Sequence, residues 1–270
     1  SGGAGCQRVS VTDVKSGGYK SNIRNAPAPA SGQIDTMTIR HIGAREWQAT
    51  EFALDAEGCA VIRNLLPDDT CRDLAGTYGC DGLFRNRVVM ARHNFGRGEY
   101  RYFAYPLPDT VAALRQAVYP PLAAIANRWH AAMGLDTRFP AEHSEFLAEC
   151  RDAGQTKPTP LVLKYGPGDY NCLHQDRYGD IVFPLQMTVL LSEPDRDFTG
   201  GEFVLTEQRP RMQSRAEVVP LGRGDAVVFA VNQRPVQGSR GFYRVTMRHG
   251  VSRVRSGMRY TLGMILHDAT

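Results

Sequence analysis

Apolar residues in the second half of the chain occur in short runs that Gly, Pro and Asp interrupt. The runs span residues 160–166, 183–192, 201–207, 216–221, 225–231, 242–251 and 258–266. Runs of this length between turn residues are typical of β-strands. Seven or eight short strands at this spacing predict a double-stranded β-helix, or jelly roll, over residues 157–270.

Residues 35–156 have a mixed pattern and predict supporting elements. We expect a strand at 58–66, helices at 67–78 and 141–154, and two helices within 109–134 that Pro120 and Pro121 separate. Residues 84–106 predict two strands joined by an Asn- and Gly-rich turn, a hairpin that is a candidate substrate lid. The helices should brace one face of a sheet, which gives an α+β, mainly β fold.

The first 34 residues are rich in Gly, Ser, Ala and Pro and have almost no apolar periodicity. They predict a flexible arm ahead of a single domain at 35–270. No apolar run approaches the roughly 18 residues that a membrane span needs. The first residues also lack the apolar stretch of a secretory signal. We therefore expect a cytoplasmic protein without a membrane partner.

Composition narrows the function only slightly. The chain has 42% hydrophobic and 22% charged residues, as ordinary globular proteins do. Its six cysteines form no C-x-x-C pair, so a zinc knuckle or a disulfide framework is not indicated, and most should be buried. A net charge of +4 permits nucleic-acid binding without arguing for it.

Candidate metal ligands lie in the β-rich half. His174 and Asp176 are two apart in an extended segment, so both side chains project to the same side and can chelate one ion. The competing pair, His143 and Glu145, lies in a predicted helix and should form part of a solvated face. His249 ends another predicted strand and completes the two-histidine, one-carboxylate set that non-haem Fe(II) oxygenases use.

An arginine ten residues after His249 is placed to bind a co-substrate. A 2-oxo acid chelated to such a metal leaves a distal carboxylate that needs a buried cation. Arg259 can pair bidentately with a carboxylate, and Thr261, two residues along the strand, adds a hydroxyl. Arg253 and Arg255 lie in a turn-like segment, where we expect contact with solvent or an anionic substrate.

The C-terminal 110 residues resemble the Fe(II)/2-oxoglutarate-dependent dioxygenase superfamily. The segments YGPGDYNCLHQD, FTGGEFVLTE, GRGDAVVFAV and RHGVSRVRSGMRYTLG follow its order of an H-x-D, a distal His and an Arg about ten residues later. Tyr165-Gly-Pro-Gly with the H-x-D is similar to AlkB-type nucleic-acid dealkylases, which implies that Tyr165 contacts 2-oxoglutarate. The Gly200-Gly201-Glu202 turn and the ten-residue spacing look more like prolyl hydroxylases.

The whole chain also resembles bacterial 2-oxoglutarate oxygenases predicted to modify nucleic acids. The resemblance implies a dioxygenase with Fe(II), 2-oxoglutarate and O₂ as cofactors and ascorbate as a candidate reductant. Its reaction would hydroxylate a substrate or oxidatively demethylate it, most simply a nucleic-acid base. A prolyl-hydroxylase-like protein or peptide hydroxylase is the alternative, and a metal- or ligand-binding β-barrel without turnover is a third hypothesis.

Cations and aromatic rings alternate along the predicted hairpin. With Arg253 and Arg255, they supply candidate contacts to phosphates and to a flipped base. The hairpin contains Arg85, Arg87, Arg92, Arg97, Arg101, Phe84, Phe95, Tyr100, Tyr102 and Phe103. The leading candidates among them are Arg85, Arg87, Arg92, Tyr100 and Tyr102. The simpler alternative is a hairpin that buries its rings in the core and leaves its arginines in solvent. The sequence does not predict the oligomeric state.

Overall fold

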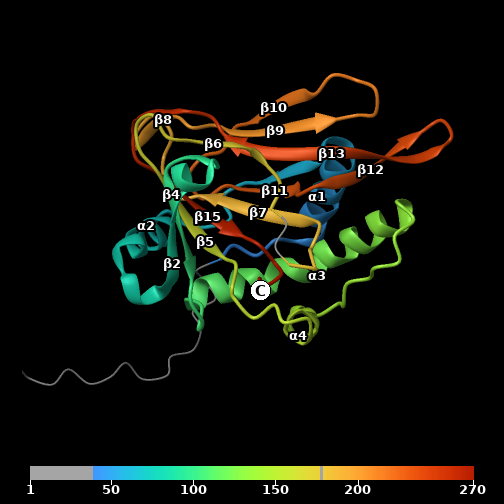
Figure 1. Cartoon of the computed structure of the whole chain (residues 1–270), viewed down its shortest axis with the longest axis horizontal. Helices are drawn as coiled ribbons and strands as arrows, with labels where there is room; N and C mark the ends of the chain where they lie inside the picture. Colours follow the sequence, from blue (N-terminus) through green and yellow to red (C-terminus); the bar gives the residue numbers. More distant parts are fainter. Residues whose placement is uncertain (1–38, 177–178) are drawn as a thin grey trace, which may run out of the picture. The chain divides into compact units, whose positions relative to one another are not determined.

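Two antiparallel sheets form the body of the protein in the computed structural model, which describes residues 39–176 and 179–270 (Figure 1). The larger sheet has the order β1-β11-β7-β15-β5-β4-β2, and the smaller one β10-β9-β13-β6-β3 with β12 paired to β13. A short pair, β14 and β8, lies apart from both. The predicted arm at 1–34 falls outside the described residues.

The seven predicted apolar runs all contain strands. They are β5 (Leu161–Tyr165), β7 (Leu185–Leu190), β9 (Phe203–Gln208), β10 (Arg215–Val219), β11 (Ala226–Ala230), β13 (Gly241–Val251) and β15 (Arg259–Met264). Strands that the pattern did not single out are β6 (Tyr170–His174), β8 (Phe198–Gly200), β12 (Gln233–Gly238) and β14 (Val254–Gly257). From β5 to β15 the chain passes repeatedly between the two sheets, as in the predicted double-stranded β-helix.

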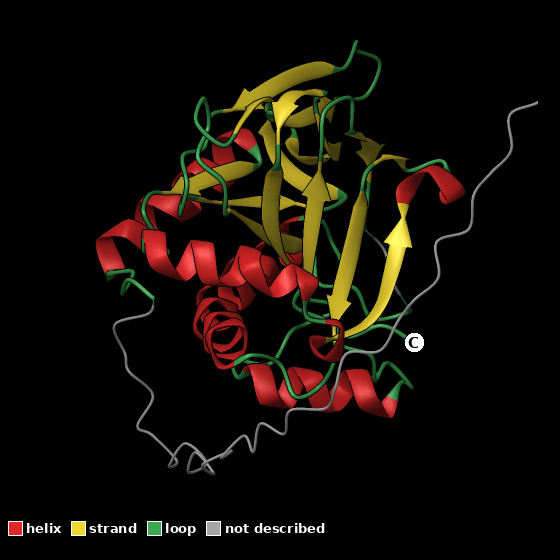
Figure 2. Ribbon diagram, turned by 90° about the vertical axis from the view of Figure 1, so that its left-hand side faces the viewer, coloured by secondary structure: helices red, strands yellow, loops and turns green. Residues whose placement is uncertain are grey.

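Four α-helices belong to the described part of the chain, and Figure 2 shows helices gathered on one side of the sheets. They are α1 (Ala44–Glu57), α2 (Asp68–Gly76), α3 (Asp109–Ala132) and α4 (His143–Asp152). The largest apolar cluster joins α3 to the larger sheet, with Trp129 and Leu122 packed in the same core as Met187 and Leu262. Helices therefore brace the larger sheet, as expected.

The prediction of two helices broken at Pro120 and Pro121 is wrong, because α3 is one continuous helix of 24 residues. Each proline removes one backbone hydrogen bond. The opposite face of the helix is fully buried at Val118, Tyr119 and Leu122, while Pro120 itself is exposed. Apolar burial on one face thus outweighs two lost hydrogen bonds near the solvent side.

The predicted hairpin at 84–106 forms the edge of the larger sheet. Strand β1 (Cys59–Ile62) lies at the opposite edge, and β2 (Phe84–Val89) pairs with β4 (Glu99–Phe103). Between the paired strands, a 3-10 turn at Met90–His93 leads to the short β3 (Gly96–Arg97), which joins the smaller sheet by pairing with β6. The segment between the strands therefore spans from one sheet to the other.

The structure tests two further predictions, one on the cysteines and one on membrane-spanning segments. The five described cysteines are free, with Cys71 and Cys150 buried, Cys59 partly buried, and Cys80 and Cys172 exposed. The expectation that most are buried is therefore wrong for these five, whereas the absence of disulfides among them agrees with the sequence. Among the described residues, no helix combines the length and the apolar character needed to cross a membrane.

Candidate active site

Strand register brings the two candidate histidines together. His174 is the last residue of β6 and lies directly opposite His249 on β13. Cross-strand neighbours have adjacent side chains, and the centroids of the two imidazole rings are 4.2 Å apart. The chain between these histidines spans most of the β-helix, so the pairing of β6 with β13 is what creates this part of the site.

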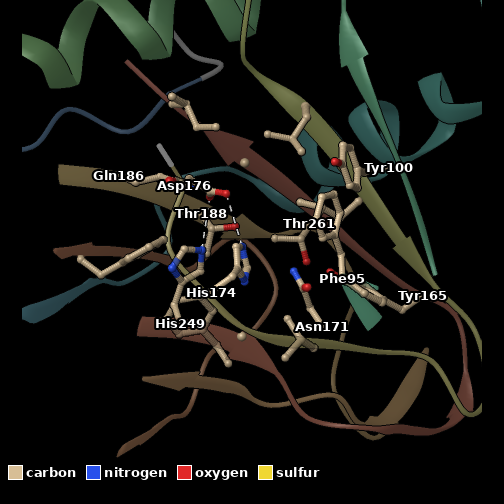
Figure 3. A pocket seen from close by; sticks show the side chains of 18 of the residues that line it. Phe95, Tyr100, Tyr165, Asn171, His174, Asp176, Gln186, Thr188, His249 and Thr261 are labelled. Carbon is tan, nitrogen blue, oxygen red and sulfur yellow. Dashed lines mark ion pairs between the residues drawn. The ribbon is translucent and has the colours of Figure 1, made fainter. Parts of the chain in front are cut away.

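Asp176 completes the cluster two residues beyond His174. Its Oδ1 lies 3.4 Å from His174 Nε2, and its Oδ2 lies 3.3 Å from His249 Nε2 (Figure 3). One donor atom from each of the three residues falls within 4.8 Å of the other two. Asp176 and His249 are buried. The structure therefore brings all three predicted ligands to one point.

Hydrogen bonds orient the donor atoms of this cluster. His174 Nδ1 donates to the Cys172 carbonyl oxygen at 2.8 Å, which directs Nε2 toward Asp176. Gln175, between His174 and Asp176, donates from Nε2 to Asn232 Oδ1 and to the Met247 carbonyl oxygen, both at 2.8 Å. The segment that carries His174 and Asp176 is thus fixed against β13.

Electrostatics in the cluster favour an ionised carboxylate. Burial alone would raise the pKa of Asp176, but hydrogen bonds from His174 and His249 outweigh it and hold this pKa well below its usual value. Burial, followed by the nearby charge of His174, lowers the pKa of His249. Burial alone would lower the pKa of His174, but the hydrogen bond to Asp176 outweighs it and raises this pKa. Two imidazoles and one carboxylate are a donor set that divalent first-row metals bind, with both imidazoles deprotonated at the metal.

A cavity of about 190 Å³ between the two sheets extends from this cluster. The smaller sheet contributes the histidines, and the larger sheet contributes polar side chains from β5, β7 and β15. The polar residues that line the cavity besides the cluster are Tyr100, Tyr165, Asn171, Gln175, Gln186, Thr188, Arg259 and Thr261. The apolar part of the lining includes Phe95, Leu163, Phe203 and Phe229.

Arg259 is a buried cation in the wall of the cavity. Its exposed fraction is 1%, and no acidic side chain in residues 39–176 and 179–270 lies within ion-pair distance of it. Nη1 donates to Thr261 Oγ1 at 2.5 Å, and Nε has no partner there. Burial lowers the pKa of Arg259 to about 10. Such a guanidinium is suited to an anion that enters the cavity.

Tyr165 lies opposite Arg259 in the pairing of β5 with β15. The Arg259 Cζ is 5.6 Å from the centroid of the Tyr165 ring and 5.8 Å from that of Phe198. Tyr165 is fully buried and, like Thr261, lines the cavity. All three residues predicted to contact a co-substrate therefore face the same space.

The predicted substrate residues of the hairpin separate into two groups. Tyr100 lines the cavity and Arg92 is exposed on the 3-10 turn. By contrast, the guanidinium of Arg85 lies 4.4 Å from the centroid of the buried Tyr102 ring. Arg87 forms an ion pair with Glu99. The buried Tyr102 ring and the exposed Arg87 fit the simpler alternative, whereas Arg85 is half-buried and donates to the Pro158 carbonyl oxygen.

Two local expectations need correction. His143 does lie on a helix, but it is buried and its Nε2 donates to the Leu266 carbonyl oxygen at 2.9 Å, so this position is not a solvated face. Arg255 lies on β14, which pairs with β8, rather than in a turn, whereas Arg253 lies in the short connection between β13 and β14, as expected. Both arginines are exposed, as expected.

Several cavity residues were not identified from the sequence. Gln186 and Thr188 on β7 alternate with the buried Met187 and Val189, and this alternation in an otherwise apolar strand was an available signal. Asn171 carried no comparable signal. Phe95 is prominent in the sequence of the hairpin, but only the crossing of the chain to β6 places it at the cavity.

Comparison with known proteins finds a matching family model and a relative. A family model described as "Oxygenase, catalysing oxidative methylation of damaged DNA" matches residues 98–269. An uncharacterised protein of Mycobacterium tuberculosis, recorded for strains CDC 1551 / Oshkosh and ATCC 25618 / H37Rv, is 45% identical over 196 residues. That alignment covers 73% of this chain and 79% of the relative.

Two solved structures resemble this chain, at lower sequence identity than the relative above. A Pseudomonas putida prolyl-4-hydroxylase has a TM-score of 0.47 and 17% identity, covering 80% of this chain and 96% of that one. A Burkholderia pseudomallei oxidoreductase of the 2OG-Fe(II) oxygenase family has a TM-score of 0.49 and 14% identity, covering 86% and 95%. Neither likeness is close enough to say anything about activity.

The family match includes every residue of the cluster and of the wall around Arg259. It confirms the superfamily predicted from the motifs, and it confirms the prediction of an enzyme over that of a barrel without turnover. The chain belongs to the oxygenase family that this model represents.

Proposed function

We propose that the protein is an Fe(II)- and 2-oxoglutarate-dependent dioxygenase that acts on a nucleic-acid base. The observation that carries the proposal is the pairing of two features in one cavity. His174, Asp176 and His249 converge at one end, and Arg259 lies buried in the wall with no acidic side chain of the described residues within ion-pair distance. The first feature suits a divalent metal and the second suits a dicarboxylate that also reaches the metal.

The donor set fits Fe(II) in particular. Two imidazole nitrogens and one carboxylate oxygen on one side of an ion leave the opposite positions open, as in non-haem iron oxygenases. The unpartnered Nε of Arg259 fits the distal carboxylate of 2-oxoglutarate. When bound, iron and 2-oxoglutarate supply the activation of O₂, with release of succinate and carbon dioxide.

Residues of this chain would hold and orient these groups. Arg259 and Thr261 would bind the distal carboxylate, and Tyr165 would close that end of the cavity. The Cys172 carbonyl oxygen keeps the His174 ring in the tautomer that presents Nε2. Phe203 and Phe229 lie beside His249 with ring centroids 6.1 and 4.6 Å away, which keeps water from that ligand.

The substrate half of the proposal is supported by the family description, which names damaged DNA. Hydroxylation of a methyl group on a base nitrogen gives an unstable hemiaminal. The overall reaction converts N-methyl base, O₂ and 2-oxoglutarate into bare base, formaldehyde, succinate and carbon dioxide. On a ring or chain carbon the same oxidation would leave a stable hydroxyl group.

One experiment separates these outcomes. The full chain is incubated with Fe(II), 2-oxoglutarate, O₂ and ascorbate as reductant, together with N-methylated oligonucleotides or with proline-containing peptides, and succinate and formaldehyde are quantified. We expect equal amounts of formaldehyde and succinate with the oligonucleotides only. Hydroxylated peptide without formaldehyde would replace the nucleic-acid substrate by the peptide alternative, and no succinate in any arm would overturn the dioxygenase.

A further inference from the structure

The segment that crosses from the larger to the smaller sheet presents an aromatic ring at the cavity. Phe95 is 47% exposed and yet lines the same cavity as His174 and Asp176. Its ring stacks on that of His93, with centroids 5.4 Å apart and planes tilted by 23°. A large ring left half-exposed at a cavity is a candidate contact for a ligand.

The backbone holds Phe95 in this position. Asn94 adopts a left-handed conformation (φ 59°) that ends the 3-10 turn. The Phe95 amide donates to the Met90 carbonyl oxygen at 3.2 Å, and its carbonyl oxygen accepts from the Cys172 amide at 2.9 Å. Phe95 is therefore tied to β6, the strand that carries His174.

Gly96 allows this close approach. Its φ of +128° is rarely adopted by other residues, and a Cβ there would lie 2.4 Å from the Tyr170 carbonyl oxygen. A side chain at this position would push the crossing segment away from β6. The local sequence Asn94-Phe95-Gly96 thus encodes a ring fixed beside the metal ligands.

Two unpaired cations continue from Phe95 along the same edge. Arg97 lies opposite Tyr170 in the pairing of β3 with β6, and the Arg253 Cζ is 6.0 Å from the centroid of the Tyr170 ring. Both side chains are exposed, and no acidic residue of the described chain lies within ion-pair distance of either. Arg87, in contrast, is paired with Glu99.

We propose that Phe95, Arg97 and Arg253 form a docking edge for a single nucleic-acid strand. The Phe95 ring stacks on the base at the cavity, and the guanidiniums of Arg97 and Arg253, two residues next to Tyr170, bind the flanking phosphates. A stacking ring beside regularly placed cations is how proteins bind single strands without reading sequence. This inference rests on the proposed function and specifies how its substrate is held.

Anisotropy of a short fluorescein-labelled oligothymidylate, titrated with the full chain at several salt concentrations, tests the edge. Phe95→Leu should weaken binding about tenfold, whereas Phe95→Trp, which keeps a stacking ring, should not. Arg97→Gln and Arg253→Gln should each reduce the slope of log K against log salt by about 0.7, one phosphate contact on a single strand. An oligouridylate arm measures whether RNA binds equally.

Arg240→Gln is the matched control. Arg240 is exposed in the turn between β12 and β13, nine residues along the chain from His249, or roughly 30 Å on an extended strand. The slope of log K against log salt for this variant should equal that of the wild type. Wild-type binding that all three edge variants leave unchanged would overturn the edge while leaving the proposed function intact. No binding of either oligonucleotide, with turnover of peptides, would overturn both.

Discussion

Two buried arginines of this protein have opposite surroundings. Arg115 on α3 is 2% exposed and donates to Asp268 Oδ1 at 2.9 Å, a carboxylate that is itself 2% exposed. It also donates to the Ile265 carbonyl oxygen and to the Tyr105 hydroxyl, each at 3.1 Å. Arg259 is as deeply buried, but among the described residues its guanidinium donates only to the Thr261 hydroxyl.

The difference separates a structural cation from a functional one. A buried charge costs free energy unless a partner compensates it. Arg115 has that partner within the fold, between α3 and the C-terminal residues. Among the described residues no carboxylate lies within ion-pair distance of Arg259, and Arg259 faces a cavity, so we expect an anionic ligand to compensate its charge. Departures of this kind from the usual pairing rules are expected at functional sites.

The largest expected effect comes from the far end of the cavity, where the anion at Arg259 would meet the metal. Asp176→Ala should lower Fe(II)-dependent succinate formation by at least about 1,000-fold, because a bound metal supplies several kcal/mol of catalysis. Asp136→Ala, at an exposed aspartate outside the cavity, is the matched control and should keep full activity. Undiminished turnover in Asp176→Ala would remove the aspartate from the metal site.

The unfolding free energies of variants at Arg115 and Arg259 test the difference between the two arginines directly. Arg115→Met leaves Asp268 buried without its cation and should destabilise the protein by about 3–5 kcal/mol. Arg259→Met leaves no carboxylate behind, so without metal and 2-oxoglutarate the free energy of unfolding should fall by less than about 1 kcal/mol, or rise. Urea denaturation of both variants checks this. Equal destabilisation would mean that Arg259 already has a compensating partner within the chain.

A smaller loss of stability is expected at acidic pH, from two buried histidines near Arg115. Burial, followed by the charge of Arg115, lowers the pKa of His143 to about 4, and that of His267 to about 4. In the unfolded chain these two histidines take up protons near pH 6.5. Their contribution to the free energy of unfolding is therefore complete above that pH and is lost as the pH falls toward 4. For His143 the loss at pH 5 is about 2 kcal/mol.

Urea unfolding of the metal-free protein at pH 7.5 and pH 5 measures this loss. His143→Gln can still donate to the Leu266 carbonyl oxygen but cannot titrate, so its unfolding free energy should depend less on pH than that of the wild type. Identical pH dependence in the two proteins would show that His143 is not the group that titrates.

Local patterns in the sequence were sufficient for much of the site. Strand periodicity placed His174 and Asp176 on one side of an extended segment, and put Arg259 and Thr261 on one face of β15. His249 was expected at the same point because a third ligand should come from another strand and His249 ends the apolar run at 242–251. Each of these inferences needs only the spacing of residues within one strand, or the succession of strands.

Features that depend on contacts distant in the sequence could not be predicted. The Arg115–Asp268 pair joins residues 153 apart, and no local pattern indicates it. Continuity of α3 through Pro120 depends on the core that its other face contacts. The position of Phe95 at the cavity depends on β3 pairing with β6 instead of continuing the hairpin.

The most direct test of the central claim is calorimetric binding of 2-oxoglutarate to the protein loaded with Mn(II) in place of Fe(II). 2-Oxobutyrate, which has the same keto acid end without the distal carboxylate, is compared in the wild type and in Arg259→Met. The wild type should bind 2-oxoglutarate about 10- to 100-fold more tightly than 2-oxobutyrate, and Arg259→Met should bind the two alike. An equal preference for 2-oxoglutarate in both proteins would contradict the assignment of Arg259 as the anchor of the co-substrate.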